Sequence, residues 1–282
     1  MDEKLQKVLA RSGIGSRREM ERWIEQGRVK VNDAVATLGE RVSEKDTIKV
    51  DNKIINQKRT QVQQRVIAYH KPVGEVCTRD DPEGRKTIFS NLPKLRSGRW
   101  ISVGRLDLNT SGLLLLTTDG ELANRLMHPS SEVEREYAVR VLGEVSPEII
   151  KQLKSNVPLD DGDAHFSDVK ESGGEGANHW YNVVLKEGRN REVRRLWEYF
   201  GFAVSRLMRI RYGDIKLERR VRPSKSEDLT DKEMEQLYTS VGLSYIPEEV
   251  TPKKDKSRFK ANKTAKNANR AVYKGKGSRN SR

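Results

Sequence analysis

The sequence contains a single cysteine, Cys77, and no long apolar stretch. One cysteine cannot form an internal disulfide, which favours a reducing compartment, and no cysteine–histidine cluster has the spacing of a zinc site. No apolar run approaches the roughly 20 residues that a membrane helix needs. The first residues are charged and lack the apolar segment of a signal peptide. These absences predict a cytoplasmic protein with no metal centre and no contact with a membrane.

The common signatures of nucleotide cofactors are also missing. No Gly-x-x-x-x-Gly-Lys-Ser/Thr run is present, and the glycine cluster at 173–176 lacks the dinucleotide-binding pattern. That cluster predicts a hairpin loop before a strand at His179. The four histidines lie apart from one another, and none belongs to a Ser/His/Asp pattern. We therefore expect chemistry that needs no cofactor.

Positive charge is concentrated towards the two ends of the chain, which has 282 residues. Residues 251–282 hold 12 basic residues and one acidic residue, and residues 1–60 hold 14 basic and 10 acidic residues. Residues 61–250 hold 29 basic and 30 acidic residues and are close to neutral. A near-neutral body with basic ends favours a catalytic domain with polyanion-binding attachments, and nucleic acid is the favoured partner. A merely solubilising tail is the alternative.

The length and a hydrophobic content of 34% predict two folded units and a segment that does not pack. In residues 1–60 we expect a helix ending near Ser12, a second helix opened by a capping box of Ser16 and Glu19, and strands at 28–32 and 47–51. The polar run 56–64 predicts a linker. Residues 246–282 predict a disordered basic tail, because almost nothing apolar follows Pro252.

Residues 61–245 predict a second domain that is rich in strands. The strand candidates are 65–70, 100–103, 113–118, 135–145, 179–187 and 203–212. The helix candidates are 119–127, 146–155, 190–200 and 230–240. Since strands and helices do not alternate regularly, we expect an α+β domain built on a mainly antiparallel sheet.

One polar loop of this domain stands between two strands and carries an aspartate. It runs Gly104-Arg105-Leu106-Asp107-Leu108-Asn109-Thr110-Ser111-Gly112 and leads into four leucines. A loop on a rigid scaffold is a usual place for a catalytic carboxylate. From the local pattern alone, an Asx-turn made by Asp107 with its Asn-Thr-Ser-Gly neighbours is the more frequent outcome.

The residues 104–120 resemble the catalytic motif of the RsuA/RluB-type family of rRNA pseudouridine synthases. Further blocks resemble other motifs of this family in the same order: Lys71-Pro72-Val73-Gly74, the tyrosine motif at 135–139, the arginine motif at 187–196 and the final strand at 207–213. Residues 4–32 resemble an S4 RNA-binding domain. Together the resemblance covers about 3–240. Within the family, residues 190–197 and the basic tail resemble the RluB branch, which acts on 23S rather than 16S rRNA.

The resemblance implies roles for three catalytic residues. Asp107 would be the essential carboxylate, Tyr137 would stack on the target base, and Arg194 would pair with Asp107 and keep it ionised. Taken alone, Tyr137 also fits a core position on a strand, and Arg194 also fits a solvated helix face.

The resemblance also implies which residues bind the substrate. Leu207 would pack against the uracil, although it equally fits plain strand core. The other substrate-binding residues would be Arg105, Arg189, Arg191 and Arg195. In the N-terminal module Arg17, Arg18 and Lys30 would contact RNA, since two arginines at the positive end of a helix dipole favour a nearby anion. A target base in a stem-loop or bulge would be flipped out of the stack.

A 16S rRNA pseudouridine synthase of the RsuA branch is one alternative, and two functions outside the family also compete. A non-catalytic ribosome-assembly factor would use the same S4 module but would have no need for Asp107. Glycosidase-like hydrolysis would need a second carboxylate at fixed spacing, and the run at 160–163 predicts a turn instead. No heptad stretch argues for a dimer, so we expect a monomer.

Overall fold

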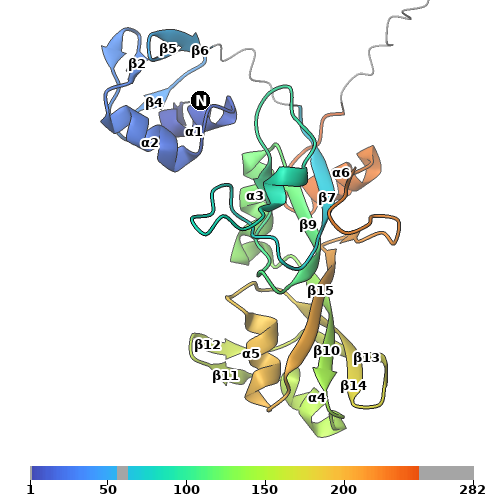
Figure 1. The fold of residues 1–282 in the computed structure, drawn as a ribbon. Helices are drawn as coiled ribbons and strands as arrows, with labels where there is room; N and C mark the ends of the chain where they lie inside the picture. The colour runs from blue at the N-terminus through green and yellow to red at the C-terminus, as the bar shows by residue number, and fades with distance from the viewer. Residues whose placement is uncertain (1, 56–62, 248–282) are drawn as a thin grey trace, which may run out of the picture. The chain divides into compact units, whose positions relative to one another are not determined.

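The computed structural model describes residues 2–55 and 63–247 (Figure 1). The predicted linker at 56–64 lies outside the described residues except for its last two positions. The predicted basic tail at 246–282 also lies outside them, except for residues 246 and 247. No helix within the described ranges is long and apolar enough to cross a membrane.

The N-terminal module combines two helices with a small antiparallel sheet. Its elements are α1 (Leu5–Arg11), α2 (Arg17–Glu25), β1 (Glu3–Lys4), β2 (Val29–Val31), β3 (Ala34–Val35), β4 (Arg41–Val42), β5 (Ile48–Val50) and β6 (Lys53–Ile55). The sheet has the order β3-β2-β5-β6, and β1 pairs separately with β4. The apolar residues Leu5, Leu9, Met20, Val29 and Ile48 are fully buried between the helices and the sheet.

Local signals explain the ends of these elements. The predicted capping box is confirmed, because the Ser16 hydroxyl accepts from the Glu19 backbone N–H at 3.1 Å, and the Glu19 carboxylate accepts from the Ser16 N–H at 3.2 Å. Asn32 and Asp33 have φ angles of 51° and 69°, the left-handed values that a two-residue hairpin between β2 and β3 requires.

A nine-stranded sheet forms the second domain. Its strands are β7 (Val66–Lys71), β8 (Ile101–Ser102), β9 (Ser111–Thr117), β10 (Arg135–Leu142), β13 (Asp168–Glu175), β14 (Asn178–Leu185), β15 (Val204–Tyr212), β16 (Ile215–Lys216) and β17 (Ser226–Asp228). The order is β13-β14-β10-β15-β9-β7-β17, with β16 beside β15 and β8 beside β9. The pairing of β15 with β9 is parallel, whereas the other pairs in this sheet are antiparallel.

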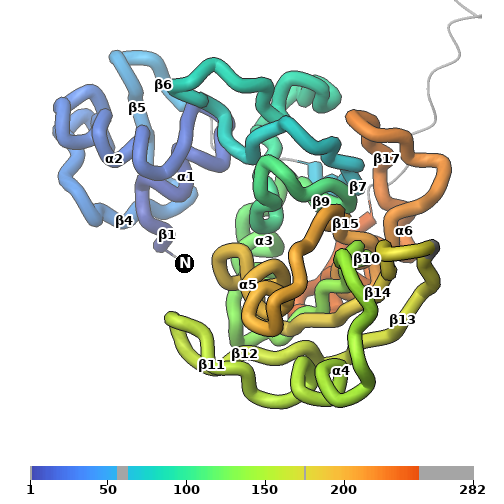
Figure 2. Tube along the Cα trace, turned by 60° about the horizontal axis from the view of Figure 1, so that its bottom comes forward, coloured from blue at the N-terminus to red at the C-terminus, as the bar shows by residue number. Residues whose placement is uncertain are grey.

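Helices cover both faces of this sheet. They are α3 (Gly120–Met127), α4 (Pro147–Leu153), α5 (Glu192–Tyr199) and α6 (Asp231–Thr239), with the 3-10 helices η2 (Ile88–Asn91) and η3 (Pro129–Ser131) and a hairpin of β11 (Val157–Leu159) and β12 (Gly162–Ala164). Leu113 and Leu115 of β9 pack with α3 and α6, whereas Leu114 and Leu116 belong to the core shared with α4 and α5. Because β9 is buried on both faces, its sequence is a continuous apolar run. Figure 2 shows α5 beside β15.

The expected α+β class with a mainly antiparallel sheet is confirmed, as are the four helices expected in the second domain. One interpretation is wrong in part. The glycine cluster at 173–176 is not all loop, because β13 continues through Gly173 and Gly174 to residue 175, and the chain turns at Gly176 and Ala177. A register shift between Glu171 and Gly174 interrupts the pairing of β13 with β14, and β13 is absent from the strands expected above.

Candidate active site

The loop between β8 and β9 holds Asp107, and a buried lysine anchors it. Lys71, at the end of β7, is completely buried, and its Nζ donates to the carbonyl oxygens of Pro72 and Asp107 at 3.0 Å each and of Thr110 at 2.8 Å. Burial lowers the pKa of the Lys71 amino group, while nearby acidic groups partly oppose that shift. An ammonium has three N–H donors, and these three carbonyls accept from all of them. Lys71 thus fixes the main chain on both sides of the Asp107 side chain.

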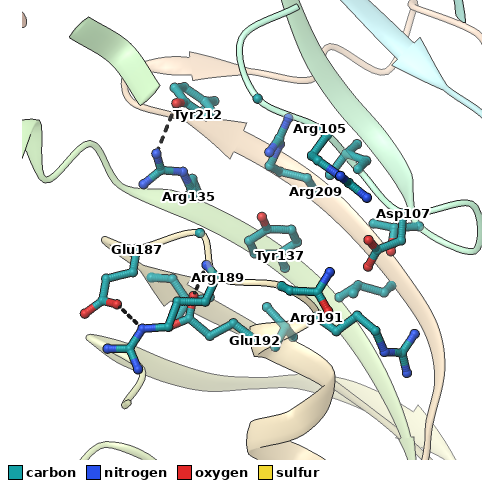
Figure 3. Close-up of a pocket in the computed structure, with 18 of the residues that line it drawn as sticks. Arg105, Asp107, Arg135, Tyr137, Glu187, Arg189, Arg191, Glu192, Arg209 and Tyr212 are labelled. Carbon is teal, nitrogen blue, oxygen red and sulfur yellow. Dashed lines mark hydrogen bonds and ion pairs between the residues drawn. The ribbon is translucent and has the colours of Figure 1, made fainter. Parts of the chain in front are cut away.

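The turn at Asp107 is made by its backbone. The Thr110 N–H donates to the Asp107 carbonyl oxygen at 3.0 Å, and the Asp107 carboxylate has no hydrogen bond or ion pair within residues 63–247. The alternative interpretation of Asp107 as an Asx-turn is therefore wrong, since that turn would use the side chain. The carboxylate instead lines a cavity (Figure 3).

Gly112 closes the loop by an unusually near approach to β15. It pairs with Arg209 in the parallel part of the sheet and has a φ of 107°. A Cβ atom at this position would lie 2.2 Å from the Arg209 carbonyl oxygen and 2.6 Å from its nitrogen. Only glycine fits both the positive φ and this contact. The loop therefore enters β9 directly against the strand that carries Leu207 and Arg209.

The cavity has a volume of about 490 Å³ and is lined mainly by five parts of the second domain, with Met127 and Pro129 at its edge. These parts are the Asp107 loop, strands β10 and β15, the segment after β14 and the start of α5 (Figure 3). It brings together most of the residues that the sequence analysis singled out. They are Arg105, Asp107, Tyr137, Arg189, Arg191 and Leu207.

The pairing of β10 with β15 sets the apolar side of the cavity. Tyr137 lies opposite Arg209, and Val139 lies opposite Leu207. Directly paired residues share one face of a sheet, so Tyr137 and Leu207 face the same way. Their exposed fractions are only 8% and 6%, and both line the cavity. An aromatic ring and an aliphatic side chain next to a carboxylate suit a flat, partly apolar ligand such as a nucleobase.

Arg194 does not make the predicted ion pair with Asp107. Its Nη1 donates to the Val204 carbonyl oxygen at 2.8 Å, and its Nη2 donates to the Asn109 carbonyl oxygen at 3.0 Å. Arg194 is 7% exposed and is not among the residues that line the cavity. Arg194 itself is buried, so its guanidinium needs acceptors, and these two carbonyl oxygens supply them. Its contact with the loop is therefore through the backbone two residues after Asp107.

The other predicted arginines differ in how firmly hydrogen bonds and ion pairs hold their guanidinium groups. Arg195 is not brought to the cavity, because both of its terminal nitrogens bind the Asp161 carboxylate, at 2.7 and 3.0 Å. Arg189 lines the cavity, but its guanidinium is held by Glu187 at 2.6 Å and by the carbonyls of Gly162 and Asp163 at 2.8 Å each. Arg191 is half exposed and lies 3.5 Å from Glu198.

The structure adds cavity residues that the sequence analysis missed. Arg135 is 7% exposed; its Nη1 donates to the carbonyls of Val133 and Lys186 at 2.7 Å each, and its Nη2 donates to the Tyr212 hydroxyl at 3.2 Å. Arg209 is 2% exposed and also lines the cavity. An arginine among apolar residues of a strand is the signal that could have drawn attention to either position.

In the N-terminal module Arg17 and Arg18 are exposed in the first turn of α2, while Lys30 is half-buried on β2, 3.4 Å from the Asn52 side chain. In the described part of the chain, no group of three or more His, Cys, Asp or Glu side chains is placed to hold a metal ion.

Two family patterns match this chain. The pattern of the RNA pseudouridylate synthases matches residues 65–199, and that of the S4 domain matches residues 3–48. Among solved structures, one titled as a pseudouridylate synthase is 26% identical, with a TM-score of 0.59; the match covers 83% of this chain and 99% of that one.

Several relatives are similar over more than nine-tenths of this chain. The chain is 57% identical over 269 residues to the ribosomal large subunit pseudouridine synthase B of Salmonella typhimurium, covering 93% of this chain and 91% of the relative. The protein of the same name from Escherichia coli K12 is 56% identical with the same coverage. That from Pseudomonas aeruginosa is 55% identical over 94% of this chain and 69% of the relative. The chain therefore belongs to the RNA pseudouridylate synthase family and is an isomerase.

Proposed function

We propose that this enzyme converts one uridine of 23S ribosomal RNA, in the large ribosomal subunit, into pseudouridine. The observation that carries the proposal is the carboxylate of Asp107, which is unpaired within residues 63–247 and lies in a cavity walled by Tyr137 and Leu207. The relatives named as large-subunit synthases support the choice of substrate, because they are 55–57% identical over more than nine-tenths of this chain.

Asp107 is the essential carboxylate of the proposed reaction. When the bond between C1′ and N1 breaks, its electron pair leaves with the uracil and positive character develops on the ribose. A carboxylate stabilises or captures such a centre, as in glycoside hydrolysis. The uracil turns in the cavity and bonds to C1′ through C5, which then loses a proton while N1 gains one. The product is an isomer of the substrate, so no oxidant, reductant or cofactor enters the balance.

The cavity is sized for one nucleotide rather than for a stacked helix. Its volume of about 490 Å³ lies in the range of small-ligand sites, typically 300–1,000 Å³. A base inside a duplex cannot enter it, so the target uridine is flipped out of the RNA, from a stem-loop or bulge. Tyr137 stacks on the flipped uracil and Leu207 packs against it.

Binding of the RNA itself is assigned mainly to the basic ends of the chain. Arg17, Arg18 and Lys30 of the S4 module contact phosphates, together with the tail after Pro252. The domain limits of the proposal are 1–60 for the S4 domain, 61–245 for the catalytic domain and 246–282 for the tail. The enzyme acts as a monomer in the cytoplasm.

The substrate is tested by mapping pseudouridine across ribosomal RNA. Cells with the wild-type gene, without it, and with the gene restored are compared. We expect one 23S position to lose its modification on deletion and to regain it on restoration. Loss of a 16S position instead would show a small-subunit enzyme. If no position changes, the chain does not modify ribosomal RNA, and an RNA-binding assembly role would take its place.

A further inference from the structure

Arg209 is a buried cation with an unused hydrogen-bond donor at the wall of the cavity. Its side chain is 2% exposed, and its Nε donates to the Leu113 carbonyl oxygen at 2.8 Å. Its Nη2 is buried and has no hydrogen-bond partner among the described residues. Arginine stays protonated in proteins, and a buried N–H without an acceptor is costly. This donor therefore points to an acceptor that a ligand supplies.

Arg211, a second arginine on β15, is paired with carboxylates in the ordinary way. Arg211 binds Glu136 at 2.7 Å and Glu134 at 3.1 Å. A register shift between Glu136 and Tyr137 makes Arg211 pair with Glu136, while Arg209 pairs with Tyr137. Glu136 and Tyr137 are consecutive, so the two arginines face opposite sides of the sheet. The bulge at Ile210 thus directs Arg209, and not Arg211, to the cavity.

A second guanidinium lies near Arg209, and no carboxylate in the described part of the second domain is bound to Arg209. The Arg135 and Arg209 guanidinium groups lie 5.0 and 5.1 Å from the centre of the Tyr212 ring. Arg135 uses its hydrogens on two carbonyl oxygens and the Tyr212 hydroxyl, as described above. Within residues 63–247, Arg209 has no ion pair, so its charge is left for a negative group that enters the cavity.

Two parts of an RNA substrate could meet this charge: a phosphate or the uracil. Phosphates of the RNA backbone stay near the mouth of a site into which a base is flipped, whereas Arg209 is almost completely buried. It also lies directly opposite Tyr137, the residue assigned to stack on the base. Its position therefore fits the base better than the backbone.

We infer that Arg209 donates a hydrogen bond to a carbonyl oxygen of the target uracil and stabilises the negative charge on the base while it is detached from the ribose. This inference rests on the proposed function. When the C1′–N1 bond breaks, the electron pair moves onto the uracil and is shared with its O2 and O4 atoms. The charge disappears again when the base forms its bond through C5 and N1 takes up a proton. Arg209 supplies no proton and is unchanged at the end.

The test combines a protein variant with a chemical change in the substrate. RNA fragments carry uridine, 2-thiouridine or 4-thiouridine at the target position, because sulfur is a weaker hydrogen-bond acceptor than oxygen. Single-turnover rates and RNA affinities are measured for wild type, Arg209→Met and the matched control Arg211→Met. Thermal unfolding checks that each variant is folded.

We expect Arg209→Met to lower the single-turnover rate on uridine about 100-fold or more, as loss of one preorganised donor does elsewhere. Its RNA affinity should change by less than about threefold, since one buried contact adds little to binding dominated by phosphates. Arg211→Met should keep the wild-type rate. One of the two thio substitutions should slow the wild type but not slow Arg209→Met any further, because the contact is already lost.

Three results would overturn the inference. The first is a normal saturating rate for Arg209→Met with weaker binding and a flatter salt dependence, which would indicate a phosphate contact. The second is that each thio substitution lowers the rate of Arg209→Met by the same factor as it lowers the rate of the wild type. The third is a rate for Arg209→Met equal to that of Arg211→Met.

If Arg209→Met does not fold, the wild type decides by itself. The contact is then refuted if the 2-thiouridine and 4-thiouridine substrates both react as fast as the uridine substrate. The proposed function is judged separately, by whether the wild type forms pseudouridine in the unmodified fragment.

Discussion

The Nη2 atom of Arg194 donates to the carbonyl oxygen of Asn109 at 3.0 Å, and its Nη1 donates to that of Val204 at 2.8 Å. One guanidinium thus ties the Asp107 loop to α5 and to the first residue of β15. Burial lowers the pKa of Arg194, and the nearby Asp107 carboxylate acts in the opposite direction. Arg194 therefore positions the carboxylate through the backbone of the loop.

Replacing Arg194 by methionine should lower the single-turnover rate about 100-fold, because a shift of the loop by about 1 Å can have an effect of this size. Arg195→Met, at the next residue of α5, is the matched control. Its guanidinium binds Asp161 outside the cavity, so it should retain activity within a few-fold of wild type. Equal losses in the two variants would argue against the loop contact and would restore Arg195 as a substrate-binding residue.

Gly112→Ala should destabilise the fold much more than Gly104→Ala, although both glycines border the same loop. Both have positive φ angles, of 107° and 77°. Strain alone costs on the order of 1–3 kcal/mol. At Gly112 the added Cβ would also meet the Arg209 backbone at 2.2 Å, whereas at Gly104 it would meet nothing within 4 Å. Urea unfolding of both variants should give a difference of at least about 2 kcal/mol. Similar free energies of unfolding for the two variants would show that β9 and β15 can move apart at Gly112 without a loss of stability.

Glu192 should make stability depend on pH in a defined direction. It is 3% exposed, and burial raises the pKa of its carboxyl group above the usual 4.5, although the Arg189 N–H opposes this at 3.0 Å. As pH falls through the raised folded pKa towards 4.5, the folded state takes up a proton before the unfolded state does. Stability from this group is therefore gained as pH falls and lost as pH rises.

Glu192→Gln removes this titration while keeping an acceptor for the Arg189 N–H. The stability of wild type relative to Glu192→Gln should increase as the pH falls from 7 to 4, and the gain approaches about 1.4 kcal/mol for each unit of pKa shift once the pH lies below the unfolded value of 4.5. Urea midpoints of both proteins at the two pH values measure it. A constant difference would mean that the Glu192 pKa is the same in the folded and unfolded states.

Truncation after Pro252 should weaken RNA binding chiefly at low salt. The removed residues include all 12 basic residues of the segment 251–282. If about half of them contact phosphates, the slope of log K against log salt should fall by roughly 4 units. A salt titration of binding to the same RNA fragment measures both slopes, and identical slopes would exclude the tail from phosphate contact.

Much of the fold is predictable because its signals are local. The capping boxes at Ser16 and Thr230 mark the starts of α2 and α6, and four consecutive leucines mark β9 as a strand buried on both faces. The strand β13 escapes such an analysis because its glycines are typical of a loop. They extend as a strand only because β14 pairs beside them.

The candidate site is less predictable, because it depends on contacts between distant segments. Asp107 and Tyr137 follow from motifs, and both line the cavity. The anchoring of the loop by Lys71 joins residues 36 and 39 positions apart. Strict alternation along β15 would also place Arg209 and Arg211 on one face, and only the bulge separates them. Neither feature has a signature in a single sequence.

The central claim is that the Asp107 carboxylate takes part in the reaction, and its neutral isostere tests it most directly. Asp107→Asn keeps the size of the side chain and leaves the backbone contacts with Lys71 and Thr110 in place. Pseudouridine formation is followed in single-turnover experiments on an unmodified 23S fragment, with saturating enzyme. We expect a rate at least about 1,000-fold below wild type, with RNA affinity within threefold, because charge stabilisation in a closed site has effects of this order. Pseudouridine formation by Asp107→Asn at the wild-type rate would contradict the claim.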